Sequence, residues 1–159
     1  MALRNLRVDG DELLRRKSRP VADITENVKT LLGDMVDTMK NSKGAGLAAP
    51  QVGVLKRLIV IDHEDELFQM INPEIQLEEG SQDAEEACLS IPGMIGTVTR
   101  PEKLTVAFTK TDGTRAEMSA EGRLAVIISH EVDHLNGVLY RDKARNFRLR
   151  TKEDDEEDD

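Results

Sequence analysis

The spacing of apolar side chains predicts an amphipathic helix in the first third of the chain. Between Asp23 and Gly44, apolar residues recur at intervals of three or four, as they do along one face of an α-helix. We expect Asp23 to cap this helix, with Glu26 completing a capping box, and Gly44 to end it. The predicted apolar face comprises Val28, Leu31, Leu32, Met35, Val36 and Met39.

Beyond this helix the pattern changes to short apolar runs typical of β-strands. Residues 44–53 are rich in Gly and Pro and are predicted to form a loop. Strands are predicted at residues 55–62 and 66–79, the second interrupted at Asn72-Pro73. Residues 103–122 have the pattern of a hairpin with its turn at Asp112-Gly113.

A last apolar run, "LAVIISHEVDHLNG" at residues 124–137, has the length of a helix and is followed by a natural stop at Gly137. We predict a helix over residues 122–135. The resulting order of helix, strands, hairpin and helix is not the regular alternation of a βαβ fold. It predicts an α+β protein in which mostly antiparallel sheets pack around this last, central helix.

Composition and charge indicate one globular domain with an acidic end. The chain has 159 residues and a net charge of −9, of which the final seven residues, "EDDEEDD", contribute seven negative charges. We therefore predict a catalytic domain over residues 1–147 and a disordered tail over residues 148–159. The basic stretch 141–152 could contact nucleic acid, although a solvated helix end is the plainer interpretation.

The chain lacks the features of a membrane or exported protein. It has no apolar run long enough to cross a bilayer, and its first residues lack the apolar segment of a secretory signal. The single cysteine, Cys88, excludes an internal disulfide and suits a reducing compartment. These features predict a cytoplasmic protein without a membrane partner.

The last predicted helix carries titratable side chains among apolar ones. His130 and His134 are four residues apart, so on a helix both imidazoles share one face and can reach one metal ion. Glu131 could then act as general base and acid beside the ion. The alternative is a pair of core histidines with ordinary hydrogen bonds. An apolar helix makes unpaired His and Glu costly, which favours the metal site.

A hydrolytic metal site of this kind needs a third protein ligand. No His follows His134, and the acidic residues beyond it are Asp142 and those of the tail. The upstream candidates are His63 and Cys88. His63 lies in the polar stretch "IDHEDEL", which is typical of an exposed turn. A lone cysteine such as Cys88 is ordinarily an inert core thiol, but a two-His site in need of a partner favours thiolate ligation.

Three segments together resemble the signature motifs of peptide deformylases: "GAGLAAPQ" (44–51), "EACLS" (86–90) and "HEVDH" (130–134). They occur in the family's order, and the resemblance extends from about Leu3 to Lys143. The joint occurrence is far more specific than any single motif. It implies a metal-dependent hydrolase that removes the N-formyl group from the initiator methionine of nascent polypeptides and releases formate.

The resemblance also implies roles for individual residues. Cys88, His130 and His134 would hold the metal, natively Fe²⁺, with Zn²⁺, Ni²⁺ or Co²⁺ possible in purified protein. Glu131 would be the catalytic acid and base, while the Gln51 amide and the Leu89 backbone N–H would stabilise the developing oxyanion. The substrate would contact the Gly44, Ala45 and Gly46 backbone and a methionine pocket formed by Ile95, Val126 and Ile127.

Further positions bear on this site. We expect Glu86 to accept the second N–H of the first metal-bound His and Arg100 to pair with Glu86, the alternative being an ordinary surface pair. Ala87 stands where the family usually has Gly, which costs about 1–2 kcal/mol only if its φ is positive; we expect it to be harmless. Ser129 replaces a common Gln and affects packing. Arg123 either lines the pocket with its aliphatic stem or is out of place there.

Two other functions are compatible with parts of the sequence. A peptidase of the H-E-x-x-H type is disfavoured by the absence of a downstream ligand and by the 44–51 loop. A non-catalytic binding protein is disfavoured because Glu131 and Gln51 are both present. The implied partners are nascent formyl-Met peptides and, transiently, the ribosome, for which residues 141–152 are a candidate docking segment. No sequence-specific recognition of nucleic acid is expected.

Overall fold

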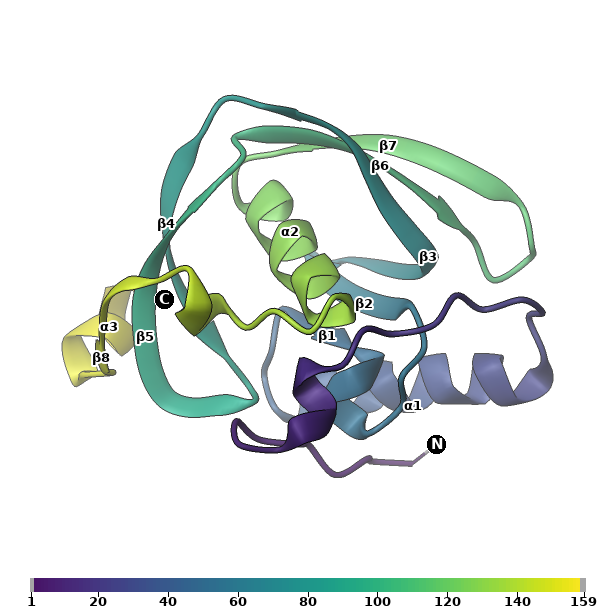
Figure 1. Cartoon of the computed structure of the whole chain (residues 1–159), viewed down its shortest axis with the longest axis horizontal. Coiled ribbons are helices and arrows are strands. Elements are labelled where there is room, and N and C mark those ends of the chain that lie inside the picture. Colours follow the sequence, from purple (N-terminus) through teal and green to yellow (C-terminus); the bar gives the residue numbers. More distant parts are fainter. Residues whose placement is uncertain (1, 158–159) are drawn as a thin grey trace.

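Helix α2 (Arg123–Leu135) lies at the centre of the fold, and two antiparallel sheets surround it (Figure 1). The computed structural model describes residues 2–157. The larger sheet has the strand order β1-β2-β3-β6-β7 and the smaller one the order β4-β5-β8. This arrangement confirms the predicted α+β class and the central position of the last predicted helix.

The strands are β1 (Gly46–Ala48), β2 (Leu58–His63), β3 (Glu66–Glu79), β4 (Gln82–Cys88), β5 (Ile91–Arg100), β6 (Lys103–Thr109), β7 (Arg115–Glu121) and β8 (Arg145–Leu149). The other α-helices are α1 (Glu26–Asn41) and α3 (Lys152–Glu157). Short 3₁₀ helices are η1 (Glu12–Arg15), η2 (Ala49–Val52) and η3 (Tyr140–Asp142). Within the described residues, no helix is both long and apolar enough to cross a membrane.

Strand β2 separates the two main parts of the core. Its side chains alternate between faces, as strand geometry requires. Ile59 and Ile61 belong to the apolar cluster that includes α2, whereas Leu58 and Val60 belong to the cluster that includes α1. All four are fully buried, which accounts for the continuous apolar run in the sequence. The two helices therefore cover opposite faces of the larger sheet at this strand.

Helix α1 differs from the prediction at both ends. The cap is Thr25, whose hydroxyl accepts a hydrogen bond from the Val28 N–H at 3.2 Å, so the predicted capping box from Asp23 was wrong. The helix ends at Asn41, and the left-handed residue beyond it is Lys43, with φ of 58°, rather than Gly44. The predicted apolar face is buried as expected.

The interruption predicted at Asn72-Pro73 is a bulge within β3. The register between β3 and β6 shifts between Ile71 and Glu74, and Asn72 has a positive φ of 51°. The Asn72 side chain accepts a hydrogen bond from the Val21 N–H at 2.8 Å and donates one to the Val21 carbonyl at 2.9 Å. These bonds hold the bulge, so β3 continues as one strand.

Strand β8 and helix α3 form the carboxyl-terminal part that the structure describes. Residues 148 and 149 belong to β8, so the predicted boundary after residue 147 falls within this strand. The buried Asp154 carboxylate accepts hydrogen bonds from Arg148 and from the Thr151 N–H. The division into a domain and a disordered tail stays a prediction, and residues 158–159 lie outside the described residues.

Candidate metal centre and substrate cleft

Three side chains able to bind a metal ion converge beside α2. Cys88 comes from the end of β4, and His130 and His134 come from consecutive turns of α2. The Cys88 Sγ lies 3.3 Å from His134 Nε2, and the ligand atoms of the three residues all lie within 4.8 Å of one another. In a tetrahedral site with ordinary bond lengths, sulfur and nitrogen ligands are about 3.6 Å apart. The donor types and their spacing thus fit a single transition-metal ion.

The strand register brings Cys88 to this position. Residues two apart on a strand point to the same face, so Glu86 and Cys88 of β4 both face α2. The β4–β5 register shifts between these two residues, which places an irregularity at Ala87. Ala87 is not among the residues with positive φ, so replacement of the family's usual Gly carries no left-handed strain.

The two histidines have different hydrogen bonds. His130 Nδ1 lies 2.7 Å from Glu86 Oε1, which leaves Nε2 directed to the cluster. His134 Nδ1 has no hydrogen-bond partner among the described residues, and burial lowers the pKa of His134 well below its usual value. His134 is therefore neutral, with a nitrogen lone pair free to bind a metal.

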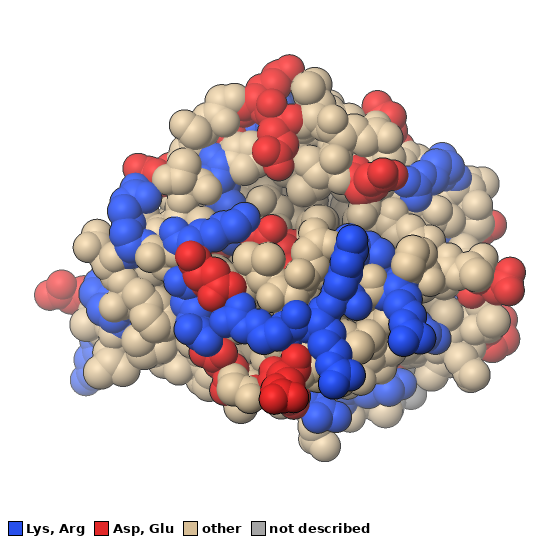
Figure 2. Space-filling model, in the orientation of Figure 1, with Lys and Arg blue, Asp and Glu red and all other residues tan. Residues whose placement is uncertain are grey.

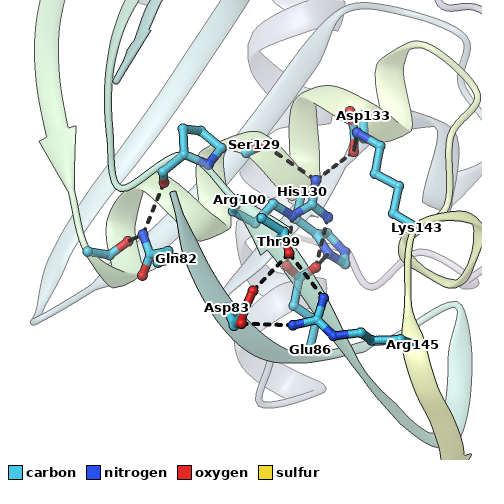
Figure 3. Close-up of polar contacts among 12 residues, drawn as sticks. Gln82, Asp83, Glu86, Thr99, Arg100, Ser129, His130, Asp133, Lys143 and Arg145 are labelled. Carbon is cyan, nitrogen blue, oxygen red and sulfur yellow. Dashed lines mark hydrogen bonds and ion pairs between the residues drawn. The ribbon is translucent and has the colours of Figure 1, made fainter. Parts of the chain in front are cut away.

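Glu86 is held by Arg100 in a buried ion pair (Figure 3). Arg100 Nε and Nη2 donate to the two carboxylate oxygens at 2.7 and 2.8 Å, and the two residues are only 2% and 3% exposed. Burial alone would raise the pKa of Glu86, but hydrogen bonds from Arg100 and His130 outweigh it and lower the pKa to about 2. The alternative of an ordinary surface pair is therefore wrong.

The network continues outward from Arg100 to the surface (Figure 3). Arg100 Nη1 donates to Asp133 Oδ2 at 2.6 Å, and Lys143 Nζ lies 2.9 Å from the same oxygen. Sequence reasoning did not identify Asp133 or Lys143 as part of the site. It also missed Tyr140, a buried side chain whose ring stacks on His130 with centroids 5.9 Å apart.

Glu131 is a buried carboxylate that borders the cluster. It is 4% exposed, and its Oε1 has no hydrogen-bond partner among the described residues. Burial is the main reason that the pKa of Glu131 is raised to about 7. A Cβ atom on Gly46 would lie 2.7 Å from Glu131 Oε2, so only glycine allows this close packing. A carboxyl group in such surroundings can exchange a proton near neutral pH.

Gln51 approaches the cluster from η2. Its Oε1 accepts a hydrogen bond from the Ala48 N–H at 2.9 Å, which fixes the orientation of the amide. Its Nε2 donates to Ser90 Oγ at 3.1 Å and lies 3.5 Å from Cys88 Sγ. The amide N–H₂ thus faces the same space as the thiol. Leu89 follows Cys88 directly and packs over Gly44, where a Cβ atom would meet its side chain at 2.7 Å.

A cleft of about 710 Å³ opens beside the cluster. Its wall includes the predicted residues Gly44, Ala45, Gly46, Gln51, Cys88, Leu89, Ile95, Val126, Ile127, His130 and Glu131, together with Arg123. Ile95, Val126 and Ile127 are buried, which gives one wall an apolar character. Lys43, Met94 and Arg150 also line it and were not predicted. His63 lies elsewhere, at the end of β2 and 3.8 Å from a Glu64 oxygen.

The fold and the site define this chain as an α+β protein with a Cys/His/His centre and a buried glutamate beside it. The sequence profile of the polypeptide deformylase family matches residues 3–150, and this chain belongs to that family.

Similar proteins agree in sequence and in structure. The chain is 50% identical over 147 residues to the peptide deformylase of Thermoanaerobacter pseudethanolicus, covering 92% of each chain. It is 45% identical over 148 residues to peptide deformylase 2 of Clostridium acetobutylicum, covering 92% of this chain and 99% of that one. The crystal structure of the Thermotoga maritima peptide deformylase matches with a TM-score of 0.89 at 38% identity, over 91% of this chain and 99% of that chain.

Proposed function

We propose that this chain is a metal-dependent deformylase that removes the formyl group from the N-terminal formylmethionine of nascent polypeptides. The observation that carries this proposal is the Cys88, His130 and His134 cluster beside a buried glutamate and an open cleft. Membership of the polypeptide deformylase family supports the same reaction. Such substrates would make the ribosome a transient partner and the cytoplasm the place of action.

Cys88, His130 and His134 are the proposed metal ligands. A thiolate with two imidazoles suits Fe²⁺, which we propose as the native ion, and also Zn²⁺, Co²⁺ and Ni²⁺. When bound, the ion supplies Lewis acidity that polarises the formyl carbonyl and makes a water molecule easier to deprotonate. The Glu86 carboxylate, kept ionised by Arg100, holds the His130 ring in the orientation that presents Nε2.

Glu131 is proposed to move the proton of the reaction. It accepts a proton from the attacking water as the new C–O bond forms at the formyl carbon. It then gives that proton to the amide nitrogen as the C–N bond breaks, which leaves formate and a free amino terminus. Its burial and its unpartnered Oε1 support this role, since both favour a carboxyl group that shares a proton with a reactant.

Gln51 and Leu89 are proposed to stabilise the negative charge on the formyl oxygen. The Gln51 amide is already fixed by the Ala48 N–H, so little reorganisation is needed when charge develops. Its Nε2 lies 3.5 Å from Cys88 Sγ, and Leu89, whose N–H is the second proposed donor, directly follows Cys88 in the chain. Donors aimed at one point in a water-poor site contribute more than they do in water.

The peptide is proposed to bind as an added strand along Gly44, Ala45 and Gly46. Strand β1 is at the edge of the larger sheet, so one side of it is not paired within the sheet. The methionine side chain would then pack against the apolar wall of the cleft formed by Ile95, Val126 and Ile127. A formyl carbon carries only hydrogen as its substituent, so it can approach a recessed site that larger acyl groups cannot.

The test is formate release from formyl-Met-Ala-Ser by anaerobically purified protein with its metal quantified. Glu131→Gln is expected to lower kcat by about 10²–10⁴-fold while the metal stays bound. His63→Gln is the matched control, because His63 lies outside the cleft lining, and it should match wild type. Cleavage of internal peptide bonds at a comparable rate would favour a peptidase. Full activity of Glu131→Gln would exclude the proposed mechanism.

A further inference from the structure

One face of this acidic protein carries a concentration of positive charge. Figure 2 shows Lys and Arg side chains in a band across the lower half of the face on which α2 is seen in Figure 1. Lys17, Arg57 and Lys143 line a hollow of about 790 Å³, whose wall also includes the acidic residues Glu74, Glu78 and Asp133. Arg19 is joined to Lys56 by an isolated parallel bridge, so the two segments lie side by side. We call the basic surface the set Arg16, Lys17, Arg19, Lys56, Arg57 and Lys143. Lys143 lies 2.9 Å from Asp133 and is the member of the set whose charge is paired.

Much of this charge is not neutralised within the protein. Arg16, Lys17, Arg19 and Lys56 are exposed and form no salt bridge with any described residue. The guanidinium group of Arg57 donates hydrogen bonds to the Leu135 carbonyl at 3.1 Å and to the Asn136 side chain at 3.1 Å, and not to a carboxylate. Other arginines nearby differ, since Arg15 pairs with Asp142 and Arg141 with Asp9.

The basic surface and the substrate cleft use different faces of α2. The hollow is lined by Ser129, Val132, Asp133 and Asn136, whereas the cleft is lined by Arg123, Val126, Ile127, His130 and Glu131. Successive helix residues are rotated by about 100°, which separates the centres of these two sets by well over a quarter turn. A large partner on the basic surface would leave the cleft open to a peptide.

We propose that the basic surface binds the phosphate backbone of RNA without reading its sequence. Arg16 has extended backbone angles, with φ of −91° and ψ of 148°, and the bridge to Lys56 fixes Arg19 in place. Extended chain from residue 16 to residue 19 spans about 10 Å. Phosphates follow one another closely along a nucleic-acid strand, so cations spread over this stretch can contact more than one phosphate.

Chemistry favours a phosphate polymer over other anions. Planar guanidinium groups match phosphate oxygens in a bidentate arrangement, and Arg16 and Arg19 each expose a guanidinium group that pairs with no described carboxylate. Outside its last seven residues the chain has a net charge of only −2, so the unpaired cations of the basic surface are not offset by a strong overall repulsion of a polyanion. The proposal rests on the proposed function only for the source of the RNA, because the ribosome that carries a nascent chain is rich in RNA.

The experiment measures binding of a fluorescein-labelled RNA hairpin with an A-form stem, by fluorescence anisotropy, as salt is varied from 50 to 200 mM. Four uncompensated cations predict a slope of log K against log salt of about −3 to −4. The test variant is Arg16→Ser/Lys17→Ser/Arg19→Ser. The matched control, Lys40→Ser/Lys103→Ser/Lys110→Ser, removes three lysines that are likewise exposed and form no salt bridge with a described residue, at positions outside the basic surface.

The test variant should weaken RNA binding at 50 mM salt by at least about 10-fold and reduce the slope by about 2–3, as expected when that many phosphate contacts are lost. The control should change binding by less than about 2-fold. Formate release from formyl-Met-Ala-Ser should be unchanged in both, which verifies folding and separates this test from that of the proposed function. An equal loss of RNA binding in both variants would overturn the proposal and indicate general charge attraction. Polyglutamate binding that is as tight as RNA binding, and as strongly weakened in the test variant, would also overturn it and indicate an acidic protein partner.

Discussion

Arg100 and Glu86 form a bidentate ion pair in the interior, with N–O distances of 2.7 and 2.8 Å, and Glu86 in turn lies 2.7 Å from His130 Nδ1. A buried carboxylate is costly unless its oxygens are fully hydrogen-bonded, and Arg100 meets that condition. Glu86 is thus ionised and fixed in place before any metal ion binds. The pair orients the ring of His130, a proposed metal ligand, through a carboxylate that is not itself one of the three proposed ligands.

Glu86→Gln should lower the affinity of the protein for its metal ion. The amide keeps the shape of the side chain but loses the charge that attracts the His130 N–H, and changes of this kind cost about 10–100-fold in metal affinity. Competition with a chelator against Co²⁺-loaded protein would measure the loss. Glu79→Gln, at an exposed position in β3, is the control and should retain the metal as wild type does. Equal retention by both variants would show that Glu86 does not orient the ring.

Gly46→Ala should impair catalysis while sparing metal content. The added Cβ would lie 2.7 Å from Glu131 Oε2, so either the carboxylate or strand β1 has to move. A displacement of about 1 Å at a reacting group can cost about 10²-fold in rate. Formate release with metal quantified in the same sample measures this.

The control for that substitution is Gly33→Ala in α1. A Cβ atom there meets nothing within 4 Å, and alanine in a helix interior is about 0.5–1 kcal/mol more favourable than glycine. This variant should be slightly more stable and fully active. If Gly46→Ala were as active as Gly33→Ala, the close packing of Gly46 on Glu131 would have no catalytic importance.

The apolar pattern of the sequence was sufficient to predict the elements that bury one face in the core. Helix α1, the β6–β7 hairpin and helix α2 were all predicted because apolar positions recur at the period of the element. Strand β4 was not, since its sequence "QDAEEAC" has acidic residues where a core-facing strand would have apolar ones. Those inward positions hold Glu86 and Cys88, which belong to the candidate site. Because the site requires polar side chains there, the apolar alternation that would indicate a strand is missing.

Other features depend on contacts between distant segments and leave no local signal. Tyr140 stacks on His130 because the chain after α2 turns back across it, which neither residue's neighbours in sequence indicate. Asp133 meets Arg100 from a different element. The cap is at Thr25, although Asp23 is of a residue type that ranks higher as a helix cap, so capping preference alone did not locate the start of α1.

Asp34→Asn should lower stability at neutral pH, and the difference from wild type should disappear in acid. Asp34 is buried on α1 and receives hydrogen bonds from Arg4 Nε at 3.0 Å and the Ala2 N–H at 3.1 Å, so the Arg4 hydrogen bond foremost lowers the pKa of Asp34. A carboxyl group with a lowered pKa in the folded state contributes stability that is present above its unfolded pKa and lost as pH falls through the folded pKa.

Thermal unfolding at pH 7 and at successively lower pH would therefore give converging Tm values for wild type and Asp34→Asn below about pH 4, the unfolded pKa of an aspartate. Asp23→Asn is the control, because Asp23 is exposed and precedes the helix. Its Tm should follow that of wild type at every pH. A difference for Asp34→Asn that persists unchanged into acid would mean that the charge of Asp34 contributes nothing.

Arg123 should make the cleft favour substrates with a carboxylate soon after the methionine. It is the first residue of α2, at a helix end where a cation is unfavourable, no acidic residue is in that turn, and it forms no salt bridge within residues 2–157. It lies seven residues before His130 on the same side of the helix, about 10 Å along the axis. Two residue intervals of an extended peptide cover about 7 Å, so the long Arg123 side chain can reach the third residue of a substrate whose first residue lies at His130.

Comparing kcat/KM for formyl-Met-Ala-Asp-amide and formyl-Met-Ala-Asn-amide isolates this charge, because the two peptides differ little in size. Wild type should prefer the aspartate peptide by about 1.4–5-fold, the range expected for an exposed ion pair of about 0.2–1 kcal/mol. Arg123→Gln should bring the ratio to about 1, and Arg123→Glu should invert it. The preference should also decline with added salt, since exposed charges are screened. A ratio that is the same in all three proteins would mean that Arg123 only lines the wall with its aliphatic stem and that its charge does not reach the peptide.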